Sequence, residues 1–460
     1  MNYVKGNSRE QIKILCIDEL VSRDSFARII DDFVDNMDTS YFEKSQLNHT
    51  GRPPYNPKDM LKLYIYGIEN GISSSRKLER ECSRNIELMW LMNELVPENK
   101  TISNFRKDNA ENLVRFFGEF CCVLKENGYI DGKIMALDGT KIRANNSRKN
   151  NYTLKKINLR LMEIEAKMTE YLSDLSLNDD IEEKIESMNK KKEKYEALKT
   201  EMESKGVKEI STTDKDARLM KANNQGTDVS YNVQSVVDSK YKLIAGMEVV
   251  CSASDNGLLG RVMPRIKEEL GLEETTVLAD TGYYKAKDFD VCENRGIYPI
   301  VAKQKERAGD LIKIDEFEYD AKEDVYICPN NKKLTRKGIV SEYYYRYMNA
   351  SGCKKCPQKA KCTTGGWREI KRNIWKESAD RNDRRLSENK GLYKQRQALA
   401  EHPFGTMKRA MGVRQFLTRG KTNVAAEVAL IFLCYNLKRL RKIMTQNPIM
   451  NGAFPRLRAV

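Results

Sequence analysis

The sequence predicts a mixed α/β protein preceded by an all-helical domain. Residues near 55–128 carry apolar side chains at helical spacing. Two short apolar runs each end at an aspartate closely followed by a glycine, as buried strands that lead into turns do. The second run is followed by a helix-like stretch and another strand, which indicates a mixed α/β sheet. At 460 residues the chain can hold several domains of roughly 100–200 residues each.

The first 128 residues are expected to be helical. "NPKDMLKLYIYGIENG" predicts a helix that stops at Gly71, and "SSSRKLERECSRN" predicts a serine-capped helix with a basic face. "TISNFRKDNAENLVRFFGEFCCVLKENG" predicts one long amphipathic helix, capped by Thr101 and closed by Gly128. Helix, glycine-containing turn and basic helix are typical of a helix-turn-helix DNA reader, but also of many other small helical domains. We therefore expect residues 1–128 to form an N-terminal DNA-binding domain.

Residues 129–450 are expected to form the α/β domain. In "GYIDGKIMALDGTKIRANNSR" the apolar run 134–137 predicts a buried strand that ends at Asp138 and Gly139. "VSYNVQSVVDSKYKLIAGMEVVCSASDNG" predicts two or three further strands. "ETTVLADTGYY" repeats the first pattern and ends at Asp280, before the helix-like "KAKDFDVCENRG" and the strand "IYPIVA". Both aspartates are thus expected at strand tips, where loops host functional groups.

Two insertions are predicted inside this domain. Residues 152–206 are almost all Lys, Glu, Leu, Ile and Met, and predict a hairpin of two helices of roughly 35 Å at about 1.5 Å per residue. We favour a structural arm over a dimeric coiled coil. Residues 305–375 form a Lys-rich, cysteine-containing insertion with little apolar material of its own. Cys353 and Cys356 have the CxxC spacing that binds tetrahedral Zn²⁺, and Cys328 and Cys362 could complete the site. The alternative is a set of reduced surface-loop cysteines.

The excess positive charge is confined to the last hundred residues. The net charge is +15, and residues 361–460 hold 22 basic and 7 acidic side chains, whereas the first 360 residues hold 59 of each sign. This distribution favours a polyanion-binding face over a solvated basic tail. The absence of a long apolar run and of a secretory signal predicts a soluble, cytoplasmic protein, in which the 11 cysteines are reduced.

The residue inventory favours carboxylate chemistry. Only two histidines occur, which nearly excludes Ser/His/Asp, Cys/His and multi-His metal catalysis. Asp138 and Asp280 on neighbouring strands would repel unless a hard divalent cation lay between them. Glu401, in the basic helix "YKQRQALAEHPFGTMKRAMG", could supply a third ligand for two metal ions about 3.5–4 Å apart, so that no protein nucleophile is needed. Taken alone, each Asp before Gly is most often a turn residue.

Three motifs carry a resemblance to a known family. "ALDGTKI", "LADTGYY" and "YKQRQALAEHPFGTMKR" resemble, in order, the three catalytic blocks of DDE transposases of bacterial insertion sequences. The third block resembles the family's Tyr-Arg-Glu-Lys signature through Tyr393, Arg396, Glu401 and Lys408. The gap between Arg396 and Glu401 holds four residues, one more than the signature has. The helical segment from about 50 to 128 also resembles the family's amino-terminal domain.

The resemblance implies an RNase H-like catalytic fold, with Asp138, Asp280 and Glu401 as catalytic ligands of Mg²⁺ or Mn²⁺. It implies that Tyr393, Arg396, Lys408 and its basic neighbour Arg409 contact DNA. It further implies a bacterial, nucleoid-associated enzyme that cuts double-stranded DNA at the element's ends and joins these to target DNA, as a homodimer or multimer. Two alternatives share the motifs: a nuclease that stops at hydrolysis, and a DNA-binding protein descended from a transposase.

Overall fold

The computed structural model describes residues 14, 16–43, 53–173, 179–222, 226–303 and 311–446. The chain divides into two compact units. The first contains residues 1–131, 139–253 and 400–460, and the second contains residues 132–138 and 254–399. Strand β1 (Ile134–Arg143) and helix α16 (Lys390–Gly405) both pass from one unit into the other. These two elements therefore belong to both units; β1 carries Asp138 in the second unit, and α16 carries Tyr393 and Arg396 in the second unit and Glu401 in the first.

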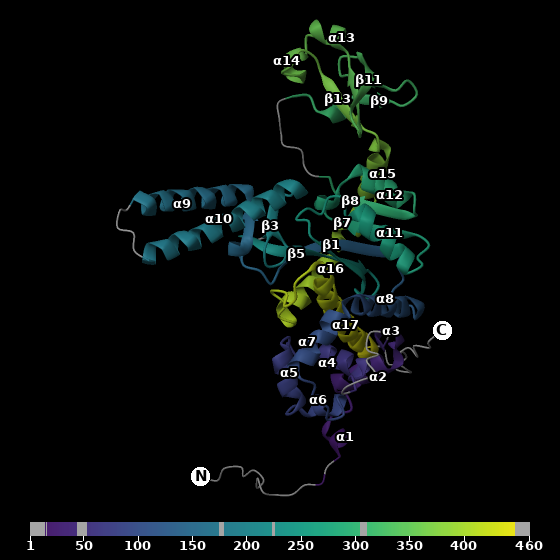
Figure 1. Cartoon of the computed structure of the whole chain (residues 1–460). Coiled ribbons are helices and arrows are strands. Elements are labelled where there is room, and N and C mark those ends of the chain that lie inside the picture. The colour runs from purple at the N-terminus through teal and green to yellow at the C-terminus, as the bar shows by residue number, and fades with distance from the viewer. Residues whose placement is uncertain are drawn as a thin grey trace, which may run out of the picture. The chain divides into compact units, whose positions relative to one another are not determined.

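The amino-terminal part of the first unit is helical, as expected (Figure 1). The helix α4 begins after Asn56, whose side chain accepts a hydrogen bond from the Lys58 amide, and Gly71 follows it at a φ of +68°. The helices of this part are α1 (Ile17–Leu20), α2 (Phe26–Asn36), α3 (Ser40–Glu43), α4 (Pro57–Glu69), α5 (Ser75–Cys82), α6 (Ile86–Leu91), α7 (Asn99–Asp108) and α8 (Ala110–Glu126).

The prediction of a single long helix closed by Gly128 was wrong. Two helices, α7 and α8, meet at Asn109, which is buried and whose side-chain amide donates to the Phe105 carbonyl at 3.0 Å. The Phe105 carbonyl also accepts from the Asn109 backbone amide at 3.1 Å, so both bonds tie Asn109 to the end of α7. Thr101 lies inside α7 and is not a cap, because α7 begins two residues earlier. Gly128, at a φ of +72°, ends α8 as expected.

The strands of the first unit lie beside the last long helix. β5 (Gly226–Asp238) pairs with β4 (Arg218–Ala222) and β6 (Ile244–Val250), and neighbours the part of β1 in this unit. Helix α17 (Lys421–Gln446) packs on β6, α4 and α8. Its fully buried Asn436 accepts from the Ile244 amide and donates to the Ile244 carbonyl, both at 2.8 Å. A side-chain amide thus satisfies the backbone of β6 as another strand would.

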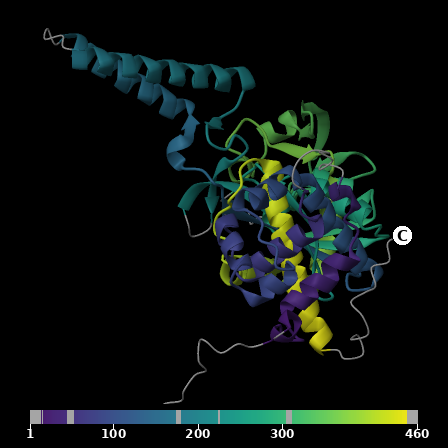
Figure 2. The ribbon, with the colours of Figure 1, turned by 60° about the horizontal axis from the view of Figure 1, so that its bottom comes forward.

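The predicted helical hairpin is formed by α9 (Leu154–Ser173) and α10 (Asp179–Lys205), which lie side by side in Figures 1 and 2. A short 3₁₀ turn, η1 (Arg148–Asn150), precedes it, and the antiparallel strands β2 (Asn151–Thr153) and β3 (Glu209–Ser211) join its base. Tyr152, Ile157, Met202 and Ile210 form a small buried cluster there. The hairpin is therefore anchored at its base.

The second unit holds the other half of the α/β arrangement. Residues 134–136 of β1 pair in parallel with β7 (Thr275–Ala279), which pairs in parallel with β8 (Ile297–Val301). The helices α11 (Leu259–Glu269), α12 (Ala286–Glu293) and α15 (Lys376–Glu388) pack with these strands. The buried Asn382 of α15 accepts from the Val301 amide and donates to the Val301 carbonyl, both at 2.9 Å. A side-chain amide thus satisfies the backbone of β8 at Val301, as Asn436 does for β6 at Ile244.

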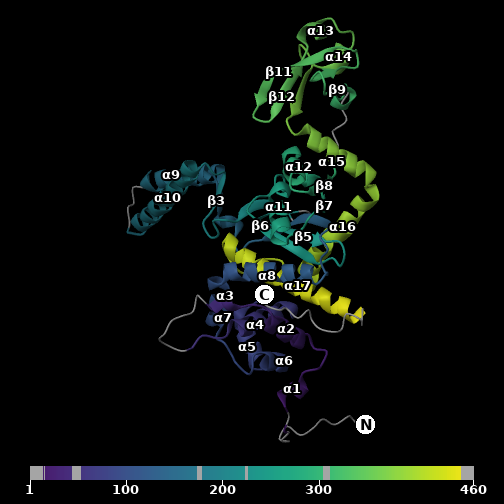
Figure 3. The ribbon, with the colours of Figure 1, turned by 90° about the vertical axis from the view of Figure 1, so that its right-hand side faces the viewer.

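The cysteine-containing insertion has a sheet and a core of its own, which corrects the expectation of little apolar material. The sheet has five strands, and Figure 3 shows it with α13 (Ala350–Lys354) and α14 (Lys359–Cys362) at one end. Phe317, Tyr326, Leu334, Tyr347 and Ile370 form the core. Residues 305–310, at the predicted start of the insertion, lie outside the described residues. The elements are η3 (Ile314–Glu316), β9 (Glu318–Asp320), β10 (Val325–Ile327), β11 (Lys333–Ser341), β12 (Tyr344–Met348) and β13 (Glu369–Asn373).

Strand β1 corrects a second prediction, because it does not end at Asp138. It continues to Arg143, while its pairing with β7 is registered only as far as Ala136. The residues beyond Asp138 pair within the other unit, where Ile142 is buried and the Ala144 amide donates to the Val229 carbonyl of β5. Asp138 therefore lies at the point where β1 changes partners. Among the described helices, none combines the length and apolar character needed to span a bilayer.

Candidate active site

Asp138 and Asp280 lie just beyond the registered pairing of two parallel strands, β1 and β7. The register pairs Ala136 of β1 with Leu278 of β7. Asp138 comes two residues after Ala136, and Asp280 comes two residues after Leu278. Because residues two apart on a strand share a face, the register extended by two places the aspartates opposite each other. Both are partly exposed, so solvent and ligands can reach them. The structure therefore supports the predicted proximity of these two carboxylates.

The turn after β7 fixes the position of Asp280. Its Oδ1 accepts a hydrogen bond from the Gly282 amide at 2.8 Å, which caps the short helix η2 (Thr281–Tyr283). Tyr283 is fully buried and anchors this turn. A Cβ at position 282 would stand 3.0 Å from Asp280 Oδ1, so the absence of a side chain allows the carboxylate to lie against the turn. The hydrogen bond uses one of the two carboxylate oxygens.

A third acid of the second unit, Asp255, was missed from the sequence. The same Cβ position at Gly282 lies 3.7 Å from Asp255 Oδ2, so the carboxylates of Asp255 and Asp280 flank one point. Asp255 sits in the polar loop "SASDNG" after β6, which resembles any surface turn. Its only sequence signal is an acid soon after a strand, and tertiary contacts were needed to place it beside Asp280.

Helix α16 contacts the end of β7 through Tyr393. The Tyr393 hydroxyl donates to the Ala279 carbonyl at 3.2 Å, one residue before Asp280. Arg396 stacks over the Tyr393 ring, with its guanidinium carbon 6.0 Å from the ring centroid. Glu401 follows on the same helix and is exposed, but it belongs to the first unit, whereas both aspartates belong to the second. Its approach to them stays a prediction.

The end of α16 is irregular, and this irregularity positions Lys408. Pro403 lies inside the helix and cannot donate a backbone hydrogen bond, and the chain continues as a π-helical turn, η4 (Thr406–Ala410). From this turn the Lys408 ammonium donates to Thr140 Oγ1 at 2.6 Å. Thr140 is two residues beyond Asp138 on β1 and shares its face. The predicted phosphate-binding lysine thus contacts the strand that carries the first aspartate.

His402, next to Glu401, is directed to a different partner. Its Nδ1 lies 2.8 Å from the Tyr435 hydroxyl of α17. Burial, together with the nearby Arg439, lowers the pKa of His402, so the ring is neutral at physiological pH. This histidine packs against α17 and supports the end of α16.

A basic groove adjoins the Lys408 contact, entirely within the first unit. It has a volume of about 690 Å³, and its walls come from the second half of β1, from β5 and from η4 with the loop after it. Only Lys408 and Arg409 of these residues were predicted to bind DNA. The lining residues are Lys141, Ile142, Arg143, Asp228, Ser230, Lys408, Arg409, Val413 and Arg414.

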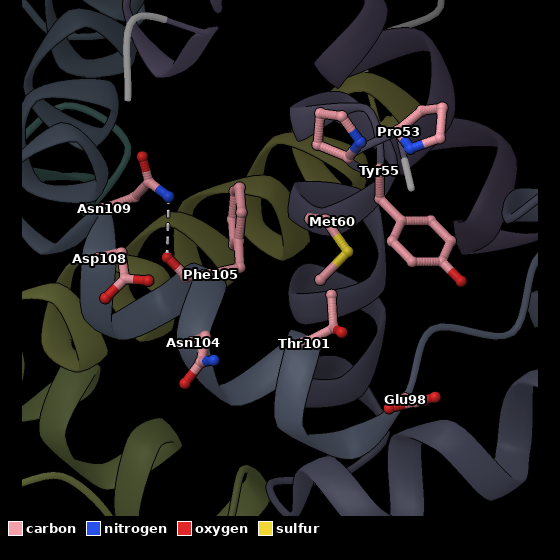
Figure 4. A pocket seen from close by; sticks show the side chains of 10 residues that line it. Pro53, Tyr55, Met60, Glu98, Thr101, Asn104, Phe105, Asp108 and Asn109 are labelled. Carbon is pink, nitrogen blue, oxygen red and sulfur yellow. Dashed lines mark hydrogen bonds between the residues drawn. The ribbon is translucent and has the colours of Figure 1, made fainter. Parts of the chain in front are cut away.

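A second cavity, of about 390 Å³, lies in the amino-terminal helical region (Figure 4). Its walls include the carboxylates Glu98 and Asp108 but neither lysine nor arginine. Asn109, in its wall, is engaged with the Phe105 carbonyl, as the dashed line in Figure 4 shows. The charge of these walls does not suit a phosphate-bearing ligand.

The four predicted zinc ligands line one small cavity. Cys328, Cys353, Cys356 and Cys362 surround a space of about 30 Å³. Two donors are directed at sulfur: the Lys332 amide lies 3.3 Å from Cys328 Sγ, and the Asn330 amide nitrogen lies 3.5 Å from Cys356 Sγ. Burial and the other three sulfurs raise the pKa of Cys362, so a cation in this cavity would help to hold Cys362 as a thiolate.

The aspartates and the four cysteines offer different kinds of metal ligand. The aspartates offer hard oxygen ligands, which suit Mg²⁺ or Mn²⁺, and the cysteines offer a soft, tetrahedral set, which suits Zn²⁺. Within the described ranges, no three Cys, His, Asp or Glu side chains are arranged to hold a metal as they stand. The aspartates contribute a pair, and the cysteine side chains would have to draw together on an ion.

Two segments of the chain match known protein families. Residues 15–108 match a family described as "Transposase domain (DUF772)", and residues 327–441 match one described as "Transposase DDE domain". No curated protein matches. A solved structure, described as the piggyBac transposase synaptic complex with hairpin DNA, aligns with a TM-score of 0.36 and 6% identity over 94% of this chain and 77% of that chain.

The two family matches fall on separate segments, one before Asp138 and one after Asp280. The second segment contains Tyr393, Glu401 and Lys408 as well as the four cysteines. Both matched segments are thus similar to transposase domains, the second of the DDE type, and this similarity supports a DNA transposase function.

Proposed function

We propose that Asp138, Asp280 and Glu401 are the catalytic carboxylates of this transposase, and that the catalytic domain has an RNase H-like fold. A DDE transposase cuts DNA and transfers its strands with the help of divalent metal ions. The observation that supports the residue assignment is the register of β1 and β7, which, extended by two residues, would bring Asp138 beside Asp280. The strand sequence β6-β5-β1-β7-β8, with parallel pairing of the last three, supports the fold.

Each residue has a distinct role in this proposal. Asp138 and Asp280 would hold the metal from neighbouring strands, and Glu401 would supply a further oxygen ligand from α16. Divalent ions supply charge stabilisation to a transferring phosphate and raise the nucleophilicity of water or of a 3′-hydroxyl. Tyr393 fixes the helix against β7, and Lys408, held at Thr140, binds a phosphate beside the scissile one. The protein's main contribution is orientation.

The finer biological assignments rest on the sequence. The Tyr393, Arg396, Glu401 and Lys408 pattern supports membership of the Tyr-Arg-Glu-Lys branch, and with it an origin in a bacterial insertion sequence, where the enzyme would work at the nucleoid. Two element ends must be held together for both to be joined to one target. We therefore propose a homodimer or larger multimer as the active form.

Alanine variants test the assignment. Asp138→Ala, Asp280→Ala and Glu401→Ala should each abolish Mg²⁺-dependent cleavage of a plasmid that carries the gene with its flanking sequence, with DNA binding retained. Joined product, from element-end DNA with a free 3′-hydroxyl and a target plasmid, should disappear in parallel. Any variant that still cleaves removes its residue from the site. A wild-type protein that binds DNA but neither cuts nor joins it would favour the DNA-binding descendant.

We also propose that Cys328, Cys353, Cys356 and Cys362 bind one structural Zn²⁺. The shared cavity and the two nitrogen donors directed at sulfur support this, because such donors stabilise metal-bound thiolates. Metal analysis of purified protein should show about one zinc per chain, and about none after Cys353→Ser with Cys356→Ser. Wild-type protein that folds without zinc would refute the site.

A further inference from the structure

We propose that the basic groove binds the sugar-phosphate backbone of the DNA strand that continues from the aspartate pair. This inference rests on the proposed function and extends it from the cut phosphate to the path of the DNA beyond. Nothing in the sequence motifs assigns Lys141, Arg143 or Arg414 to DNA. Their placement in one groove with Lys408 comes from the fold.

The charge of the groove is strongly one-sided. Five of its lining residues are basic and one, Asp228, is acidic. That acid is engaged by two guanidinium groups, with Arg143 Nε at 2.8 Å and Arg148 Nε at 3.3 Å. Arg409 and Arg414 are exposed, and neither has an ion-pair partner among the described side chains. Cations grouped without matching acids repel one another, and a polyanion relieves that repulsion.

The groove is built on fixed backbone contacts. The Phe416 amide donates to the Arg143 carbonyl at 2.9 Å, and the Gln415 side chain donates to the Ala144 carbonyl at 3.2 Å. These bonds hold the loop after η4 against the end of β1. Gly412, at a φ of +67°, makes the turn between Arg409 and Arg414. Arg409 and Arg414 are thus presented from both sides of a turn that is held in place before DNA binds, which limits the ordering cost of binding.

Several residues of the groove lie a short way beyond Asp138 along β1, or contact that part of β1. Lys408 bonds to Thr140, two residues from Asp138, and Arg143 is five residues from Asp138 on the same strand. At about 3.3 Å per residue this is roughly 16 Å, and a duplex advances about 3.4 Å per nucleotide of one strand. The part of β1 from Asp138 to Arg143 is therefore as long as about five nucleotides of DNA. The DNA backbone would pass Lys408 first and then Arg409 and Arg414.

The salt dependence of DNA binding tests this inference. Each phosphate contact contributes about 0.9 to the slope of log K against log salt on duplex DNA. Arg409→Ala with Arg414→Ala should therefore make the slope shallower by about 1.8 on a fluorescent duplex of arbitrary sequence. Arg409→Lys with Arg414→Lys keeps both charges and should keep most of the slope. Arg265→Ala, which removes an exposed cation on α11 outside the groove, is the matched control.

The outcomes separate the groove from the catalytic assignment. If the double alanine variant keeps the wild-type slope while the wild type cleaves DNA with Mg²⁺, the groove does not bind the backbone and the catalytic proposal stands. If the alanine variant loses slope but Asp138→Ala still cleaves, the groove stands and the catalytic assignment fails. If both the double alanine variant and the double lysine variant lose the salt slope, the loss comes from structural damage. That result would overturn the assignment of phosphate contacts to Arg409 and Arg414.

Discussion

Replacement of Asp280 by asparagine should make the metal-free protein more stable and abolish its stabilisation by Mg²⁺. Asparagine has nearly the same shape, and its side-chain oxygen can keep the 2.8 Å bond from the Gly282 amide. The substitution therefore removes charge with little change in packing. In the proposed site this charge stands beside Asp138 and near Asp255, and the like charges repel one another. Catalytic acids often cost stability in this way.

The magnitude follows from the sheet geometry. Adjacent strands lie about 4.8 Å apart. Two unit charges at about that distance repel by about 1 kcal/mol in a water-like dielectric and by about 3 kcal/mol at an effective dielectric constant near 20. Because both aspartates are partly exposed, the lower value applies. A gain of about 1 kcal/mol raises the Tm of a unit of this size by roughly 2–4 °C.

Thermal unfolding with and without Mg²⁺ measures both effects. At about ten times its Kd, a ligand that binds only the folded state stabilises it by about 1.4 kcal/mol. The wild type should show this shift, and Asp280→Asn should not. Asp290→Asn is the control, because Asp290 is an acid of the same unit that accepts from Ser378 and lies outside the site. Equal Mg²⁺ shifts in Asp280→Asn and wild type would refute a metal site at Asp280.

Three further predictions concern the scaffold. Zinc should be lost as the pH falls, because protons compete for the thiolates and burial raises the pKa of Cys362; chelator competition across a pH series measures this, and pH-independent retention would contradict it. Gly260→Ala should destabilise the protein by about 1–3 kcal/mol, because the new Cβ would stand 3.0 Å from Asp288 Cα, whereas Gly118→Ala, with nothing within 4 Å, should stabilise α8 by about 0.5–1 kcal/mol. Denaturant unfolding compares the pair, and equal effects would contradict the packing argument. Asn436→Ala should cost about 2 kcal/mol, because it leaves the buried Ile244 amide unpaired and the Ile244 carbonyl with only the weak Cys121 thiol as donor. An unchanged midpoint would show that water replaces the side-chain amide.

The sequence determined the local features of this protein. Apolar periodicity placed the helical region, the helical hairpin and the strand before Asp280, because side chains repeat every 3.6 residues on a helix and every two on a strand. The sequence also identified Asp138 and Asp280, at the ends of apolar runs, and four cysteines, by their spacing. Sequence periodicity could not show that helix 101–128 breaks at Asn109 or that β1 runs on past Asp138, since both depend on hydrogen bonds to neighbours.

The tertiary structure decided which distant residues meet. The parallel register of β1 and β7, extended by two residues, would bring Asp138 beside Asp280, and the turn at Gly282 brings Asp255 near, although no local pattern marks that residue. Lys408 reaches Thr140 across 268 positions of sequence. The groove joins cations from β1 with cations from the end of the chain. The charge and periodicity of a segment can be read from its sequence, but contacts between distant elements depend on packing. The basic groove is formed by such contacts, so only the tertiary structure shows it.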